Sequence, residues 1–142
     1  MSEIQGMHQT NFLAAKARAK KLARDKVKIF APFLGVEKKI GRISIKDLRS
    51  RWGSCSSQGN LNFHYKIVLI PEELADYIVV HELAHLLELN HSHRFWALVK
   101  SVIPDYKKKT LQLRRIEREF ITSVPRVKKK SELIKLFENF FH

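Results

Sequence analysis

The sequence between positions 81 and 85 reads His81-Glu82-Leu83-Ala84-His85, an H-E-x-x-H motif within an apolar stretch typical of a buried helix. Residues four positions apart lie on the same face of an α-helix, so the imidazoles of His81 and His85 can bind one small cation. Glu82 lies about 100° further around the helix. It can reach the edge of the site without being a ligand and accept a proton from a metal-bound water. The motif predicts a zinc site.

A catalytic zinc takes three protein ligands and keeps a fourth position for water, so one further ligand is needed. His91 is the strongest candidate, because it follows His85 by six positions, just after Asn90, a residue that tolerates the left-handed conformation at helix ends. The resulting spacing is that of the metzincins, except that Glu88 stands where those enzymes have a turn-forming glycine. His93 and Glu88 are the alternative third ligands.

A single histidine on an apolar helix more often forms a structural hydrogen bond than binds a metal. Three histidines at this spacing, with a glutamate after the first, favour a metal site. The remaining histidines His8, His64 and His142 have no partner pattern, and we expect them on the surface or in structural roles.

The chain has 142 residues, a length typical of one domain with a sizeable core. We expect residues 1–120 to form a metal-dependent hydrolase domain and residues 121–142 a C-terminal extension with an amphipathic helix. No run of about 18 apolar residues is present, and the N-terminus lacks the features of a signal peptide. With a single cysteine, Cys55, these features predict a cytoplasmic protein.

The net charge of +13 is unevenly distributed along the chain. Residues 1–50 have 12 basic and 4 acidic side chains, residues 51–100 have 4 and 5, and residues 101–142 have 11 and 5. Basic segments on both sides of a near-neutral metal-binding segment can attract an anionic partner, either nucleic acid or a phosphorylated small molecule. A solvated basic surface without a specific partner is the alternative.

Hydrophobic periodicity predicts an α+β fold, in which a small antiparallel sheet packs on the H-E-x-x-H helix, between an N-terminal basic helix and C-terminal helices. The N-terminal helix is expected over residues 11–31, ended by Pro32 and Gly35. The expected strands are 42–48, 51–55 and 61–70, with a turn at 58–60 joining the last two.

Capping signals mark the later helices. Pro71 is expected at the first position of the metal-binding helix, which ends near Glu88. Ser92 is expected to cap the next helix, which Pro104 ends. A very basic helix should follow over residues 106–120, and an amphipathic one over 131–141.

Several separated segments carry a resemblance to a known family. They are Arg49–Ser57 (RSRWGSCSS), Gly59–Phe63 (GNLNF), Tyr77–Leu86 (YIVVHELAHL) and Asn90–Trp96 (NHSHRFW). In this order, and over roughly residues 10–116, they resemble the YgjP-like metallopeptidase-domain family. They are more distantly similar to the SprT-like and WLM groups of small zinc proteases.

The resemblance implies a compact zincin-like α+β fold with zinc on His81, His85 and His91 and with Glu82 as the general base. It also implies that the Arg51-Trp52 pair lines the cleft. The leading hypothesis is therefore a zinc-dependent hydrolase, a metallopeptidase acting on a peptide or protein. A metal-dependent nucleotide or phosphate-ester hydrolase and a zinc-containing nucleic-acid-associated protein are the alternatives. An extended peptide substrate could pair with an edge strand, 51–55 or 61–65.

Overall fold

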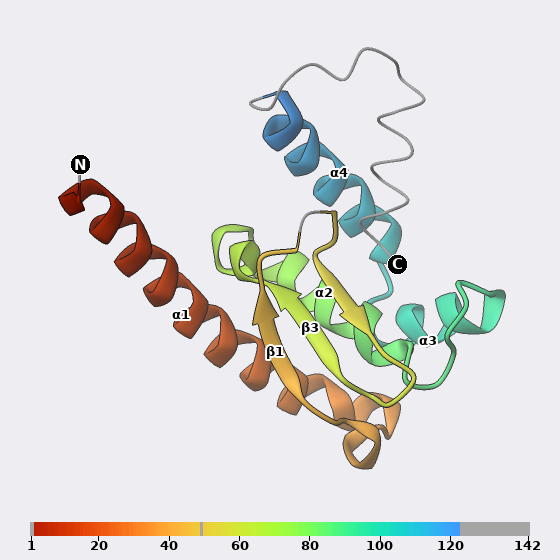
Figure 1. Ribbon diagram of the computed structural model, residues 1–142. Coiled ribbons are helices and arrows are strands. Elements are labelled where there is room, and N and C mark those ends of the chain that lie inside the picture. The colour runs from red at the N-terminus through yellow and green to blue at the C-terminus, as the bar shows by residue number, and fades with distance from the viewer. Residues whose placement is uncertain (1, 49, 123–142) are drawn as a thin grey trace.

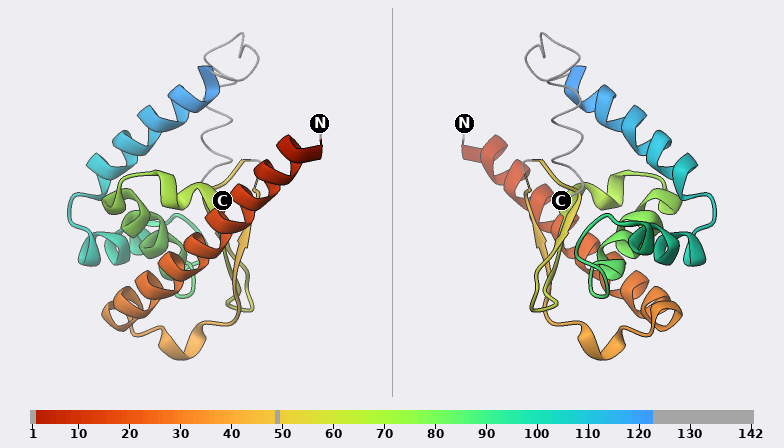
Figure 2. Two further views of the ribbon diagram at one scale, coloured as in Figure 1. Left: turned by 90° about the vertical axis from the view of Figure 1, so that its left-hand side faces the viewer. Right: turned by 90° about the vertical axis from the view of Figure 1, so that its right-hand side faces the viewer.

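The computed structural model describes residues 2–48 and 50–122, and its element order confirms the α+β fold class (Figure 1). The elements are α1 (Ser2–Leu34), η1 (Glu37–Lys39), β1 (Ile43–Lys46), β2 (Gly53–Cys55), β3 (Leu61–His64), η2 (Tyr65–Leu69), α2 (Glu72–Ala84), α3 (His93–Val102) and α4 (Tyr106–Thr122). The H-E-x-x-H helix, α2, packs against β2, and α1 packs against both α2 and β1. The N-terminal part of α1 and the C-terminal end of α4 extend beyond this core (Figure 2).

The sheet has the strand order β1-β3-β2 and is mixed. β2 and β3 are antiparallel, with Gly53 opposite Phe63, whereas β1 and β3 are parallel, with Ile43 opposite Leu61. The predicted wholly antiparallel sheet is therefore wrong for β1. Only β2 and β3 are joined by a short turn, which forces an antiparallel pair, and β1 has no such connection to its neighbour.

The third strand ends at His64, so the strand predicted over 61–70 is too long. The imidazole Nδ1 of His64 accepts a hydrogen bond of 3.0 Å from the backbone N–H of Lys66, and this contact turns the chain into the 3-10 helix η2. In η2, Ile67 is buried and Leu69 is exposed, although an extended strand would place both on the same face.

The helix α1 is longer than predicted and buries the small side chains Ala19, Ala23, Val27 and Ala31 along one face. It continues through Pro32 to Leu34, and Gly35 then takes the left-handed conformation with φ of 65°. The N–H of Val36 donates to the carbonyl of Ala31, a bond typical of a glycine-terminated helix end.

A nearly buried lysine joins α1 to the beginning of α2. Lys26 lies 2.7 Å from the carboxylate of Glu72 and 2.6 Å from that of Asp76. Pro71 is the N-cap residue of α2, one position before the predicted first helical position, and the side chains of α2 are buried around most of its circumference. The first turn of α2 is therefore fixed against α1.

The helix α2 ends at Ala84, four residues before the predicted end near Glu88. The N–H groups of Leu86 and Leu87 donate to carbonyls only three residues back. This tighter turn leads the chain away from the helix axis, so that it can fold back toward α2.

The helix α3 begins as predicted, since the Oγ of Ser92 accepts a hydrogen bond of 3.3 Å from the N–H of Phe95. The basic helix is also confirmed, as α4. The amphipathic helix predicted over 131–141 lies outside the described residues, and the domain boundary at residue 120 stays a prediction. In the part of the chain that the structure describes, no helix combines the length and apolar character needed to cross a membrane.

Candidate metal centre

Three histidines converge beside the C-terminal end of α2. His81 is on the last turns of the helix, His85 is its C-cap residue, and His91 follows on the returning chain. One ring nitrogen from each lies within 4.8 Å of the others, and the Nε2 atoms of His81 and His91 are 3.1 Å apart. Nitrogen ligands about 2.0–2.1 Å from a tetrahedral zinc lie roughly 3.3 Å from one another. The three imidazoles therefore fit a metal ion.

The outer nitrogen of His85 is held by a backbone carbonyl. Its Nδ1 lies 3.0 Å from the carbonyl oxygen of Glu88. A carbonyl only accepts hydrogen bonds, so in the neutral ring Nδ1 carries the proton and Nε2 keeps a lone pair for a metal. The tight turn after α2 thus sets the tautomer of this histidine.

The outer nitrogen of His81 is held through a longer series of contacts. Its Nδ1 lies 3.4 Å from Oη of Tyr77, which is hydrogen-bonded to the side chain of Thr110. The hydroxyl of Thr110 in turn donates to the carbonyl of Tyr106 at 2.9 Å. Because that hydroxyl's proton is committed, Tyr77 donates to Thr110 and accepts from Nδ1–H of His81. Nε2 of His81 is left with its lone pair, and α4 takes part in fixing it.

Aromatic rings pack around the imidazoles. Phe95 stacks on His85 with the ring centroids 4.5 Å apart, and Trp96 stacks on His91 at 5.8 Å. Tyr106 in turn stacks on Trp96, with the ring centroids 5.2 Å apart. Because Ser92 fixes the start of α3, the helix presents both of its aromatic residues to the histidines. This packing restricts the rotation of the imidazole rings.

Glu82 is 3% exposed and lies between α2 and β2. A Cβ atom added at Gly53 would lie 3.0 Å from Cγ and 3.1 Å from Oε2 of Glu82, so only glycine gives the carboxylate this room. Burial raises the pKa of Glu82 to about 8, and the positive charge of Arg51 partly opposes this effect. Its Oε1 has no hydrogen-bond partner in the described part of the chain, which is costly unless a ligand or water fills the space beside it.

The alternative third ligands lie elsewhere. His93 is exposed as the first residue of α3 and is not part of the histidine group. The carboxylate of Glu88 lies 3.9 Å from Nε of Arg94. His64 is buried beside Asp47, at 3.5 Å, in a structural position.

The Arg51-Trp52 pair is divided between two environments. Arg51 is exposed and its charge acts on Glu82, whereas Trp52 is buried in the core. Beside the histidines, a pocket of about 170 Å³ is lined by Cys55, His85, Leu89, Asn90 and His91. Burial and the charge of Glu82 raise the pKa of the Cys55 thiol to about 11, so this thiol stays protonated.

Sequence reasoning missed Tyr77 and Gly53. A signal for Tyr77 exists, because it precedes His81 by four positions and therefore shares its helix face. Nothing local indicates that Gly53 lies against Glu82, since this contact joins a strand to a helix distant in the sequence.

Comparisons with known proteins identify a family and a structural neighbour. The family model of the YgjP-like metallopeptidase domain matches residues 7–116. No curated protein matches the sequence. A similar solved structure is the crystal structure of the metallopeptidase zymogen abylysin of Pyrococcus abyssi, with a TM-score of 0.61 and 26% identity, covering 66% of this chain and 92% of that one. The chain belongs to the YgjP-like metallopeptidase-domain family.

Proposed function

We propose that the chain is a zinc-dependent peptidase in which His81, His85 and His91 hold the metal and Glu82 is the general base. The observation that carries this proposal is the convergence of three imidazole nitrogens next to a buried carboxylate with an unpartnered oxygen. Three nitrogen ligands suit zinc and leave one position for water or substrate, as in catalytic rather than structural zinc sites. When bound, the metal supplies a lowered pKa of its water ligand and polarisation of the scissile carbonyl.

Glu82 provides the proton transfers. Burial raises the pKa of Glu82, so its carboxylate, when ionised, is a stronger base than that of an exposed glutamate. Oε1 is the free acceptor, so we assign to it the proton removed from the attacking water. The same oxygen then donates the proton to the nitrogen of the leaving amine. Gly53, which has no side chain, leaves room for the other side of the carboxylate.

An extended peptide can reach the site by pairing with β2. β2 is an edge strand and contacts α2. The alternative edge predicted from sequence, 61–65, is wrong because β3 lies in the middle of the sheet. Backbone pairing along β2 would carry a substrate past Gly53 and Cys55, next to Glu82 and the histidines.

The variant Glu82→Gln tests the assignment of the base. It preserves the shape of the side chain, so zinc content and thermal stability should match the wild type, while peptide hydrolysis should fall by about 100-fold or more. Glu88→Gln is a matched control on the same segment. Loss of zinc in proportion to activity would contradict the role of Glu82. Release of phosphate from nucleotides by the wild type, without cleavage of any peptide, would favour the phosphate-ester alternative.

A further inference from the structure

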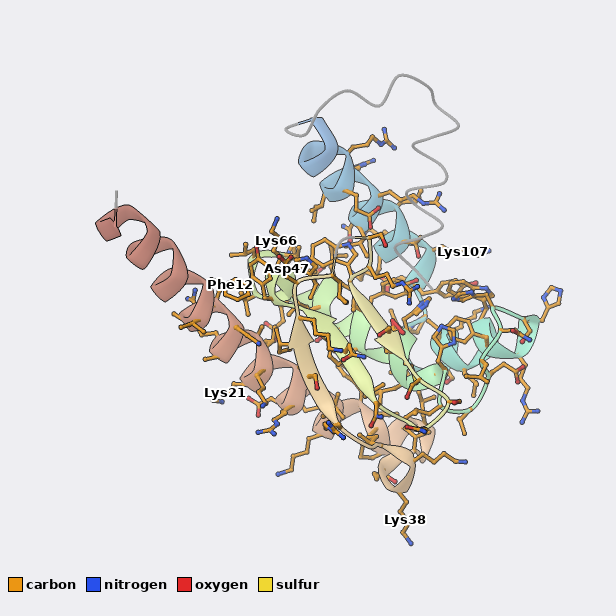
Figure 3. All side chains as sticks on the ribbon, viewed as in Figure 1. Phe12, Lys21, Lys38, Asp47, Lys66 and Lys107 are labelled. Atoms are coloured by element: carbon orange, nitrogen blue, oxygen red, sulfur yellow. The ribbon has the colours of Figure 1, made fainter. Side chains whose placement is uncertain are left out.

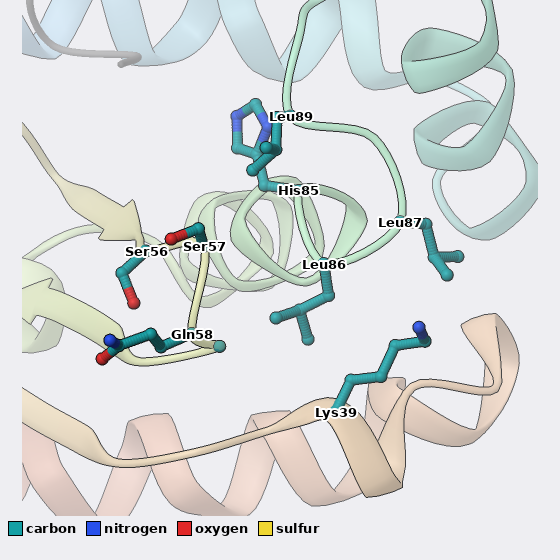
Figure 4. A pocket seen from close by; sticks show the side chains of 9 residues that line it. Lys39, Ser56, Ser57, Gln58, His85, Leu86, Leu87 and Leu89 are labelled. Atoms are coloured by element: carbon teal, nitrogen blue, oxygen red, sulfur yellow. The ribbon is translucent and has the colours of Figure 1, made fainter.

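A larger pocket, of about 370 Å³, lies next to the metal centre (Figure 4). It shares His85 and Leu89 with the smaller pocket beside the histidines, so the two hollows adjoin. A substrate residue close to the scissile bond can therefore enter it.

Three segments of different chemistry form the walls. The turn 56–59 after β2 supplies hydroxyl and amide groups, and the chain leaving α2 supplies the aliphatic side chains of Leu86 and Leu87. The third wall is η1, from which Lys39 extends toward the leucines in Figure 4. The lining residues include no aspartate or glutamate, so Lys39 gives the pocket a positive charge.

The wall that carries Lys39 is packed tightly against the turn. Gly59 has φ of 84°, and a Cβ atom there would collide with the carbonyl oxygen of Lys39. The N–H of Gly41 donates to the carbonyl of Gly59 at 2.8 Å, and the N–H of Arg42 donates to Oδ1 of Asn60 at 2.8 Å. The backbone around the pocket is therefore preformed, which is typical of a binding site.

We propose that this pocket is a specificity subsite that binds a carboxylate of the substrate near the scissile bond, through Lys39. The inference rests on the proposed peptidase function and names the substrates that it favours. The methylene groups of a glutamate would pack against Leu86 and Leu87, with its carboxylate beside the Lys39 ammonium. The free C-terminal carboxylate of a peptide substrate has the same chemistry. The net charge of +13 favours acidic substrates over basic ones.

A matched control is adjacent in the sequence. Lys38 is also exposed and belongs to the same 3-10 helix, but it does not line the pocket and points away from the molecule in Figure 3. Lys38→Glu and Lys39→Glu therefore change the net charge equally, and only the second changes the pocket.

The first test is hydrolysis by the zinc-loaded protein of peptides that differ by Glu, Gln or Lys at one position, scanned along both sides of the cleaved bond. We expect kcat/KM of the wild type to favour Glu over Gln about threefold at one position, the size of an exposed ion pair. Lys39→Glu should reverse the order so that Lys is favoured, and Lys38→Glu should keep the wild-type order. Peptides with free and amidated C-termini distinguish a side-chain carboxylate from the chain terminus.

The second test is binding of the same peptides, fluorescently labelled, to the Glu82→Gln variant, measured by anisotropy. The order of affinities should follow the order of kcat/KM. Hydrolysis without acidic preference, or a preference that Lys38→Glu changes as much as Lys39→Glu does, would overturn the subsite and leave the peptidase assignment standing. Absence of both hydrolysis and binding for every peptide would overturn the two proposals together.

Discussion

The indole N–H of Trp52 donates a hydrogen bond of 3.0 Å to Oε1 of Glu117, a residue 65 positions later in the chain. Trp52 directly precedes β2 and Glu117 is on α4, so this contact joins the edge strand to the last described helix. Both side chains are buried, and Oε2 of Glu117 has no hydrogen-bond partner among the described residues. Burial raises the pKa of Glu117 to about 7.

The first prediction is that Glu117 makes folding sensitive to pH. In the unfolded chain a glutamate loses its proton near pH 4.3, whereas folded Glu117 keeps it up to about pH 7. The folded state therefore binds more protons in this window, and wild-type stability should fall as pH rises through it. Glu117→Gln keeps the acceptor for Trp52 and removes the ionisation. At pH 8 the free energy of unfolding of Glu117→Gln should exceed that of the wild type by roughly 2–4 kcal/mol.

Denaturant unfolding at pH 5 and pH 8 measures this difference. Glu37→Gln, which neutralises an exposed carboxylate on η1, is the control and should follow the wild type. Parallel stability curves for the wild type and Glu117→Gln would show that Glu117 is ionised in the folded protein.

The second prediction concerns the third metal ligand. His91→Ala should reduce zinc content and affinity strongly, because it removes one of three convergent nitrogens. His93→Ala should leave both unchanged, since His93 is exposed on α3. Metal analysis after dialysis at defined free zinc measures the effect. Equal loss of zinc in the two variants would mean that the ligand set is different.

The third prediction concerns the contacts behind His81. Tyr77→Phe removes the acceptor for Nδ1–H and should weaken zinc affinity about 10-fold, a value typical of outer hydrogen bonds to metal-binding histidines. Thr110→Val should have a smaller effect in the same direction, because Tyr77 keeps its oxygen. Competition with a chromophoric chelator measures both. Unchanged zinc affinity in Tyr77→Phe would show that this contact does not orient His81.

The fourth prediction separates the base from the metal. In Gly53→Ala the new methyl group lies about 3 Å from the side chain of Glu82 and must displace it. We expect kcat to fall by about 10- to 100-fold through misplacement of the carboxylate, with zinc content retained. Ser54→Ala, at the neighbouring position of β2, is the control for strand stability. A rise in KM alone would place the effect on substrate pairing instead.

The fifth prediction tests the nucleic-acid alternative. Lys109 lies 3.0 Å from Glu73 and 3.4 Å from Asp105. Lys107, labelled in Figure 3, and Lys108 are exposed on the same helix. If α4 binds phosphates, the logarithm of the DNA-binding constant should fall linearly with the logarithm of the salt concentration. The magnitude of that slope should decrease by about 0.9 for each phosphate contact removed. Reversing the charge of Lys107 and Lys108 together should then weaken binding, with zinc content unchanged. No measurable DNA binding by the wild type at low salt would leave α4 as a solvated basic surface.

The parts that sequence reasoning predicted depend on local signals. The histidine spacing, Pro71 at the start of α2 and Ser92 at the start of α3 each act within one or two helical turns. Such signals need no knowledge of the rest of the chain. They were enough to predict that the three candidate histidines lie together.

The parts that sequence reasoning missed depend on long-range contacts or on competing local ones. The parallel pairing of β1 with β3 is not encoded by a turn. The early end of β3 depends on His64, whose imidazole competes for a backbone N–H that an extended strand would leave to its neighbour. The room that Gly53 gives to Glu82 becomes visible only when β2 packs on α2.

The three histidines and Glu82 differ in the number of structural elements that position them. His81 and His91 are ten positions apart, so α2 and the turn after it supply all three nitrogens. The position of the Glu82 carboxylate depends on β2 as well, a strand that β3 and η2 separate from α2 in the sequence. A population in which the sheet has come apart could therefore retain its metal while having no catalytic power. Zinc stoichiometry would then overstate the active fraction of a preparation, and active-site titration is the sounder measure of intact molecules.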